Sequence, residues 1–263
     1  MKPAKTNSVK SISGRYGWVP DLPDQRDHLF AVPGALATRL PGSVDLRPKC
    51  PPVLDQGQLG SCTANALANA HLFNQLAQPG GQDQLPSRLF IYWNERNLEG
   101  TTNSDSGAQI RDGIKVLAKL GAPPEPLWPY AIAKFATKPP AKAYQAALSH
   151  QALTYQRVTQ SLSQLKGALA LGFPVVFGFT VYESFESPAV AKTGIVPMPG
   201  AAERAVGGHA VMAVGYDDSK QVFRVLNSWG SGWGQKGFFT IPYAYLVSSD
   251  LASDFWTLRL VKE

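Results

Sequence analysis

The hydrophobic pattern of this chain changes its period once, at Gly172-Phe173-Pro174. Before that point, apolar residues recur at three- and four-residue spacing, which is typical of amphipathic helices. After it, short runs rich in Val, Phe, Tyr and Thr are separated by Gly or Asp turns, which is typical of strands. A helical half followed by a β-rich half predicts an α+β fold rather than alternating βαβ units.

The elements expected from these patterns are bounded by breakers. The first strong helical run begins at Cys62 and ends at Pro79-Gly80-Gly81. Further helices are predicted at about 86–98, 107–120, 139–149 and 161–171, and strands at 175–181, 209–216, 221–227, 236–241 and 255–261.

Composition excludes several classes of protein. With 44% hydrophobic and 17% charged residues, most of the 263-residue chain should fold around a core. No run approaches the roughly 18 apolar residues that span a bilayer, so no membrane partner is expected. Two cysteines are too few for a disulfide scaffold. The polar N-terminus lacks the apolar region of a secretory signal, so a cytoplasmic location is expected, with non-classical export left open as an alternative.

The net charge of +6 is diffuse. Six basic and three acidic residues lie in 1–40, and nineteen basic and sixteen acidic residues lie in the remainder, so the excess divides evenly. No Lys/Arg cluster of the kind that binds nucleic acid is present. We interpret the basicity as solvated surface and expect no nucleic-acid partner.

Cys62 follows the glycine-containing segment that starts at Asp55 and enters the first long helix. A helix N-terminus carries free backbone N–H groups and partial positive charge, which favours the thiolate, the nucleophilic form of cysteine. The Cys62 N–H and the Gln56 amide are candidate donors to an oxyanion. A buried structural cysteine is the alternative for this segment taken alone.

A thiol nucleophile needs a base, and His209 is the best placed of four histidines. It opens a strand after Gly207-Gly208, whereas His71 lies on the far face of the Cys62 helix and is interpreted as a packing or surface residue. His28 and His150 lie in the tail and after a polar helix. Asn227, 18 residues beyond His209, precedes Ser228-Trp229-Gly230. The asparagine is a candidate to orient the imidazole, with Trp229 shielding the bond; a hairpin with aromatic packing is the alternative.

The order Cys, His 147 residues later, then Asn matches a Cys–His–Asn catalytic set. Over residues 41–263 the chain resembles the papain-like (C1) cysteine peptidases, and its Tyr16 to Asp27 leader resembles that of the compact bacterial, xylellain-type branch. The resemblance implies Cys62 as nucleophile, His209 as general base and acid, Asn227 as orienter and Gln56 as oxyanion donor. It implies that Trp229 covers the Asn–His pair.

Substrate contacts are implied more loosely. Asp105-Ser106-Gly107 takes the place of a family strand that pairs with extended substrate, so Ser106 and Gly107 are candidate binding residues with Gly208 and Trp229. Phe177, Gly178 and Val206 are candidates to line the main specificity pocket. Leu59 stands in place of a disulfide cysteine. Thr63 stands in place of a tryptophan, which predicts a more open cleft near the leaving group, and Gly208 in place of an acidic residue or asparagine is expected to alter the pH profile.

The sequence thus predicts a two-lobed papain-like fold, with a helical lobe at about 50–125, a β-barrel-like lobe at about 126–263 and the active site between them. The expected activity is hydrolysis of peptide or protein substrates, as an endo- or exopeptidase, by a monomer needing no metal or cofactor. The proline-fixed residues 1–40 are interpreted as a tail or pro-segment that lies along the cleft and restrains a zymogen until removed. Alternatives are a thiol-dependent acyltransferase or ligase, and an inactive peptide-binding relative.

Overall fold

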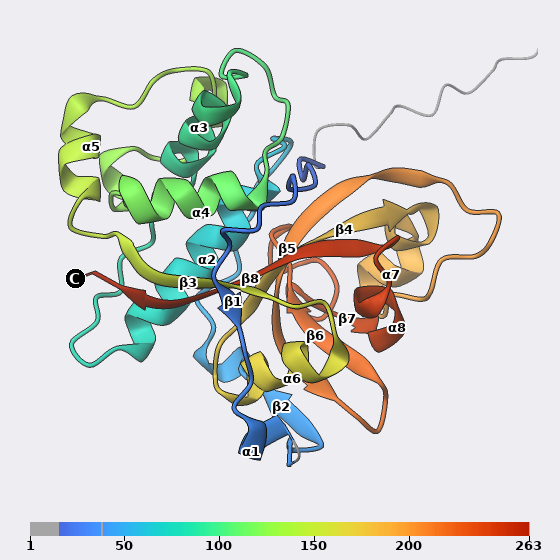
Figure 1. Ribbon diagram of the computed structural model, residues 1–263. Helices are drawn as coiled ribbons and strands as arrows, with labels where there is room; N and C mark the ends of the chain where they lie inside the picture. The colour runs from blue at the N-terminus through green and yellow to red at the C-terminus, as the bar shows by residue number, and fades with distance from the viewer. Residues whose placement is uncertain (1–15, 38, 263) are drawn as a thin grey trace, which may run out of the picture.

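The computed structural model describes residues 16–37 and 39–262. Its helices and strands separate into a helical lobe around α3, α4 and α5 and a lobe built on a sheet (Figure 1). The helices are α1 (Gly34–Ala37), α2 (Cys62–Ala77), α3 (Arg88–Glu99), α4 (Ile110–Lys119), α5 (Ala141–Ala147), α6 (Leu162–Ala170), α7 (Pro188–Thr193) and α8 (Tyr243–Val247). The strands are β1 (Leu29–Phe30), β2 (Ser43–Asp45), β3 (Ala152–Val158), β4 (Val175–Tyr182), β5 (Ala205–Asp217), β6 (Val222–Leu226), β7 (Phe238–Pro242) and β8 (Ala252–Val261).

The eight strands form one sheet in the order β1-β3-β8-β4-β5-β6-β7, with β2 paired to β5. All pairs are antiparallel except β1 with β3. Within the described part of the chain the sheet stays open, with β1 and β7 at its two ends. The α+β, two-lobed papain-like prediction is confirmed, but the β lobe is an open sheet rather than a barrel. Pairing of β4 with β5 sets Phe179 opposite His209 and Thr180 opposite Gly208.

Helix α2 runs between the two lobes and contacts both the sheet and the helices α3 and α4. Its sequence is rich in alanine, which favours the helix and lets neighbouring backbones approach closely. Every residue from Cys62 to Gln75 is buried. The helix ends at Gln78, because Pro79 cannot continue it. A helix buried on all sides is held rigidly, so its first residue is fixed relative to both lobes.

The predicted helices and later strands are confirmed to within a few residues at their ends. Strand β3 was not expected from the sequence, because its residues alternate weakly and most are half-buried on both faces. The short helices α1, α7 and α8 were not expected either. Helices this short have no long amphipathic pattern to reveal them. Their positions are set by the strands that precede and follow them.

The N-terminal chain enters between the two lobes before it reaches β1 (Figure 1). Trp18 forms a parallel bridge with Ala108, and β1 then extends the sheet beside β3. Residues 1–15 of the predicted tail lie outside the described residues. The rest of residues 1–40, apart from residue 38, is therefore packed along the body of the protein. We refer to Tyr16–Asp27 as the leader segment.

Candidate active site

Cys62 is the first residue of α2, as the sequence predicted. The side chain of the preceding Ser61 makes no capping bond, and the backbone of Thr63 in the first turn hydrogen-bonds to Cys62. Cys62 is fully buried, and both it and Cys50 are free thiols. Burial raises the pKa of Cys62 to about 12, against hydrogen bonds with the backbone of Ala210 and Gly17. The thiol is therefore neutral while the site is covered in this way.

His209 and Asn227 are brought together by the hairpin of β5 and β6. The His209 ring Nε2 lies 2.8 Å from Asn227 Oδ1, and both residues are buried. The same Asn227 oxygen accepts the Ser228 N–H at 2.9 Å, which fixes the amide. The indole of Trp229 lies 4.9 Å from the imidazole, tilted by 31°, and covers the pair. The hydrogen bond between Cys62 and the backbone of Ala210 places the thiol beside His209.

Gln56 is buried beside the same turn of chain. Its Oε1 accepts the Ser228 hydroxyl at 2.6 Å, and its Nε2 donates to Leu59 O at 2.9 Å. Its backbone N–H donates to Ser228 O at 2.9 Å. The amide is thus held between the loop that leads into α2 and the chain that carries Asn227. Gln56 and Cys62 come from one segment, His209 and Asn227 come from the β5–β6 region, and the bonds between Gln56 and Ser228 join the two.

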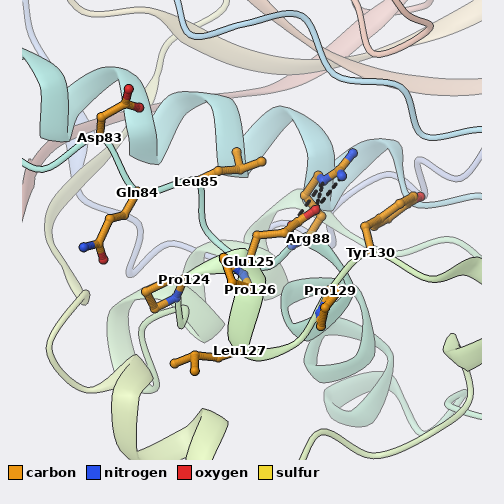
Figure 2. Close-up of a pocket in the computed structure, with 10 residues that line it drawn as sticks. All are labelled: Asp83, Gln84, Leu85, Arg88, Pro124, Glu125, Pro126, Leu127, Pro129 and Tyr130. Carbon is orange, nitrogen blue, oxygen red and sulfur yellow. Dashed lines mark hydrogen bonds and ion pairs between the residues drawn. The ribbon is translucent and has the colours of Figure 1, made fainter.

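A cavity of about 780 Å³ is lined by Arg88 of α3 and by residues before that helix and around Glu125, and Figure 2 shows these residues. Arg88 binds Glu125 across it at 2.5 Å and stacks over the Tyr130 ring at 4.0 Å. Tyr130 donates to Gln56 O at 2.9 Å, and Arg88 donates to Asp55 O at 3.2 Å. Two residues that line this cavity therefore support the loop that carries Gln56.

The leader segment covers the candidate catalytic residues. The Tyr16 ring lies edge-on to two rings: its centroid is 6.2 Å from that of His209 and 6.1 Å from that of Trp229. Gly17 lies so close to Gly60 that a Cβ on it would come within 1.7 Å of Gly60 O. These contacts account for the burial of the thiol and the imidazole. The prediction that the N-terminal chain lies along the cleft is matched by this geometry over the described residues.

Backbone pairing holds the leader segment on both sides of the cleft. Ala108 donates to Gly17 O at 2.7 Å and accepts the Val19 N–H at 3.0 Å. On the other side, the Trp18 N–H donates to Gly208 O at 3.0 Å. An extended chain is thus recognised through its own peptide groups, independently of its side chains. The cleft has the hydrogen-bonding edges that peptide binding requires.

The predicted binding residues are placed unequally. Gly107, at φ 72°, lies under the leader segment, where a Cβ would come within 2.2 Å of Gly17 O. Gly208 pairs with the segment directly. The Ser106 hydroxyl instead bonds to Thr101 within its own loop, and Ala108, which the sequence did not single out, makes the pairing. Among the specificity candidates, Gly178 contacts the segment, Phe177 is buried, and Val206 is exposed.

The prediction for Thr63 is wrong. Its side chain is fully buried and donates to Glu95 of α3 at 2.9 Å, so it points into the helical lobe rather than at the cleft. Burial raises the pKa of Glu95 well above its ordinary value. The residue after Cys62 therefore sets packing beneath α2, and a threonine there leaves the cleft wall unchanged. His71 is buried as well, with its Nε2 bonded to His150 O, as the packing interpretation predicted.

The acidic end of the leader segment is held by two arginines of the body. Arg111 of α4 binds Asp27 at 2.5 Å, and its backbone N–H donates to Asp21 at 2.9 Å. Arg157 of β3 reaches Asp21 and Asp27 at 3.3 Å and Asp254 at 2.8 Å. Asp21 also accepts the Trp256 indole N–H. Three carboxylates and two guanidinium groups thus form one cluster at the base of the leader segment.

Two further features bear on the chemistry. Over the described residues, no three His, Cys, Asp or Glu side chains gather in a way that would hold a metal ion. Across the same residues, no helix has the length and hydrophobicity to cross a membrane.

A covered thiol beside an asparagine-bound imidazole, at the junction of a helical and a β lobe, defines a cysteine peptidase site, and comparison with known proteins agrees. Residues 40–254 match the model of the papain family of cysteine proteases, and the chain belongs to this family. It is similar to xylellain, a cysteine protease from Xylella fastidiosa, with 42% identity, a TM-score of 0.89 and coverage of 97% of this chain and 99% of that one.

Other relatives extend the comparison. An uncharacterized peptidase C1-like protein of Acanthamoeba polyphaga mimivirus is 43% identical over 97% of this chain and 90% of its own length. A cathepsin B-like protein of Giardia intestinalis is 30% identical over 82% of this chain. The fold is shared with procathepsin L2 of Tenebrio molitor at a TM-score of 0.76 and 22% identity. The predicted papain-like family and hydrolase class are confirmed; with a viral and a bacterial relative, the bacterial assignment stays a prediction.

Proposed function

We propose that this papain-family peptidase cuts peptide bonds with Cys62 as its nucleophile. The Cys62 proton passes to His209, and the thiolate sulfur forms a bond to the substrate carbonyl carbon. Gln56 Nε2 and the Cys62 N–H stabilise the oxyanion. The tetrahedral intermediate collapses, the C–N bond breaks, and His209 protonates the leaving amine. Water, deprotonated by His209, then attacks the thioester and releases the acid and the free thiol.

The bond between His209 and Asn227 carries this proposal. Because Nε2 faces Asn227 at 2.8 Å inside a cover formed by Trp229, the imidazole is held in one orientation. Asn227 engages one ring nitrogen, and in this proposal the other, Nδ1, exchanges the proton with the thiol. Asn227→Ala is expected to lower kcat by one to two orders of magnitude, since it releases the ring but leaves the thiol and the base in place.

We also propose that the enzyme is made as a zymogen. With the leader segment in place, Cys62 and His209 are both fully buried and the thiol is neutral, so no substrate carbonyl reaches the sulfur. The leader must leave the cleft before the enzyme can turn over. Loosening it with Tyr16→Ala and Trp18→Ala together is expected to speed labelling of the full chain by a thiol-reactive peptide epoxide.

Endopeptidase action is the finer proposal. The chain that occupies the cleft continues on both sides of Gly17, with Tyr16 against Trp229 on one side and Trp18–Asp27 on the other. A cleft that accepts residues on both sides of the contact with the thiol suits a substrate that is cut within its chain. Mass spectrometry of a digested unstructured protein should show internal cuts; removal of terminal residues alone would contradict this.

The decisive experiment labels the loosened chain, the wild type and Cys62→Ala with the same epoxide. The proposal expects labelling that is fast in the loosened chain, slow in the wild type and absent in Cys62→Ala. Equal labelling of wild type and Cys62→Ala would refute Cys62 as the nucleophile. Product masses separate hydrolysis from acyl transfer, because hydrolysis adds water and transfer adds an amine. Peptide binding by the loosened chain without any labelling would indicate an inactive relative.

A further inference from the structure

The leader segment fills a side-chain pocket next to the nucleophile. The Trp18 indole lies against two glycines of the sheet: a Cβ on Gly178 would come within 1.9 Å of the ring, and one on Gly208 within 2.9 Å. Any side chain at these two positions would take the space of the indole. Gly17, the preceding residue, contacts Cys62. The pocket therefore receives a side chain within two residues of the point at which the sulfur meets the chain.

A buried carboxylate closes this pocket. Asp254 Oδ2 accepts the Trp18 indole N–H at 3.1 Å and the Asp21 backbone N–H at 2.8 Å. Asp254 Oδ1 accepts from Arg157 at 2.8 Å. One oxygen is thus committed to the body of the protein, and both donors to the other belong to the leader segment. When the leader leaves, Oδ2 loses both of these hydrogen bonds while the arginine still holds the carboxylate in place.

The surrounding charges decide which donor fits. In the covered state, Arg111 and Arg157 face Asp21, Asp27 and Asp254. Two of those three carboxylates depart with the leader, which leaves Arg157 bonded to Asp254 and Arg111 on α4 without its two leader carboxylates. A cationic side chain would meet that excess of positive charge, and a carboxylate side chain would meet Asp254 itself. A neutral aromatic side chain with an N–H donor avoids both repulsions.

We propose that Asp254 is a specificity-determining residue that selects substrates with tryptophan in this pocket over those with phenylalanine or arginine. The inference rests on the proposed departure of the leader segment. Trp18 serves as the model ligand: the glycines give the ring its room and Asp254 Oδ2 receives its N–H. A phenylalanine leaves that oxygen without a donor in a desolvated place, which a site built for hydrogen bonding rejects.

The first test compares substrates. The full chain loosened by Tyr16→Ala and Trp18→Ala is given fluorogenic peptides that differ only in the pocket residue, after cleavage of a peptide mixture has located that position. We expect kcat/KM for tryptophan to exceed that for phenylalanine and for arginine by about tenfold or more. In the Asp254→Asn version the ratio should fall severalfold, because a neutral oxygen accepts more weakly. Asn tolerates the positive φ of 59° found at this position.

The matched control is Asp250→Asn, an exposed carboxylate four residues earlier, which should leave all ratios unchanged. The proposal would be overturned if the tryptophan and phenylalanine peptides were cleaved equally well and Asp254→Asn behaved like its parent. A preference for the arginine peptide would also overturn it. If the loosened chain neither cuts peptides nor reacts with the epoxide, the proposed function has failed instead. In that case the second test still shows whether the pocket binds an indole through its N–H.

The second test needs no catalysis. In the full chain carrying Trp18→Ala alone, added indole should bind the vacated pocket and raise the midpoint of thermal unfolding, as small ligands do in a fitting cavity. The probe 1-methylindole, which lacks the N–H donor, should bind about tenfold more weakly. Wild type, whose pocket is filled, should bind neither. Equal binding of the two probes to Trp18→Ala would show that a hydrogen bond from the indole N–H to Asp254 does not contribute to binding.

Discussion

The two ends of the leader segment are held by opposite kinds of interaction. At Tyr16–Trp18 the Tyr16 ring packs against His209 and Trp229, and the backbone hydrogen-bonds to Ala108 and Gly208. At Asp21–Asp27 they are carboxylates enclosed by Arg111 and Arg157, away from the thiol. The first end blocks chemistry, and the second anchors the block. Because substrates must compete only with the first, the second end can set how tightly the leader stays without altering the cleft.

Loss of the anchor is expected to have the largest effect. Arg111→Met leaves Asp27 and Asp21 in a nearly closed site with one guanidinium, and removing one partner of a buried pair typically costs about 3–5 kcal/mol. Labelling of Cys62 by a peptide epoxide in the full chain should speed up by two or more orders of magnitude. Thermal unfolding must show that the body stays folded; unchanged labelling in a folded variant would mean that the aromatic end holds alone.

Loss of the blocking ring comes next. Trp18→Ala removes a half-buried indole and its bond to Asp254, for which we expect a cost of about 2 kcal/mol in docking. Epoxide labelling should rise by one to two orders of magnitude. Gly178→Ala should disrupt the same contact from the other side, because the Cβ of the alanine would lie 1.9 Å from the Trp18 ring. If only one of Trp18→Ala and Gly178→Ala speeds labelling of Cys62, the packing of the Trp18 ring in this pocket does not hold the leader in place.

A change of pH should sharpen the comparison, because Asp21 of the anchor titrates near neutral pH. Burial and the neighbouring Asp254 raise the pKa of Asp21 to about 6 in the docked state. The docked leader therefore binds a proton more tightly than the released one, and docking strengthens as pH falls through that value. Between pH 7 and 5 leader release should drop by up to about tenfold. Asp21→Asn should remove this dependence; an identical pH profile in that variant would assign the effect elsewhere.

The smallest effect is expected from an exposed ion pair in the same segment. Arg26 binds Asp24 at 2.7 Å, but the Arg26 side chain is 89% exposed and both partners lie within the leader. Such a pair contributes little, because water screens it and both side chains lose freedom. Arg26→Ala should change labelling by less than about twofold. A larger change would show that charge in the leader, rather than burial of charge, controls its release.

Much of the candidate site could be anticipated from sequence because its members carry local signals. Cys62 follows glycines at a helix start, His209 follows glycines at a strand start, and Asn227 precedes a Trp/Gly cluster. Ala108 and Asp254 carry no such signal, since alanine and aspartate occur anywhere on a surface. The open sheet and strand β3 were also beyond reach, because pairing partners and closure depend on contacts between distant segments.

The sequence alone indicated the main helices and strands, the family and four candidate catalytic residues, because periodicity and local spacing are properties of neighbouring residues along the chain. The tertiary structure alone shows that the leader segment covers these residues. Trp18 meets Asp254 across 236 residues, and Asp21 meets Arg157 across 136. No local pattern encodes such distances. Only folding brings Asp21 and Asp27 of the leader to two arginines on separate elements, and so turns a polar N-terminal stretch into the cover of the active site.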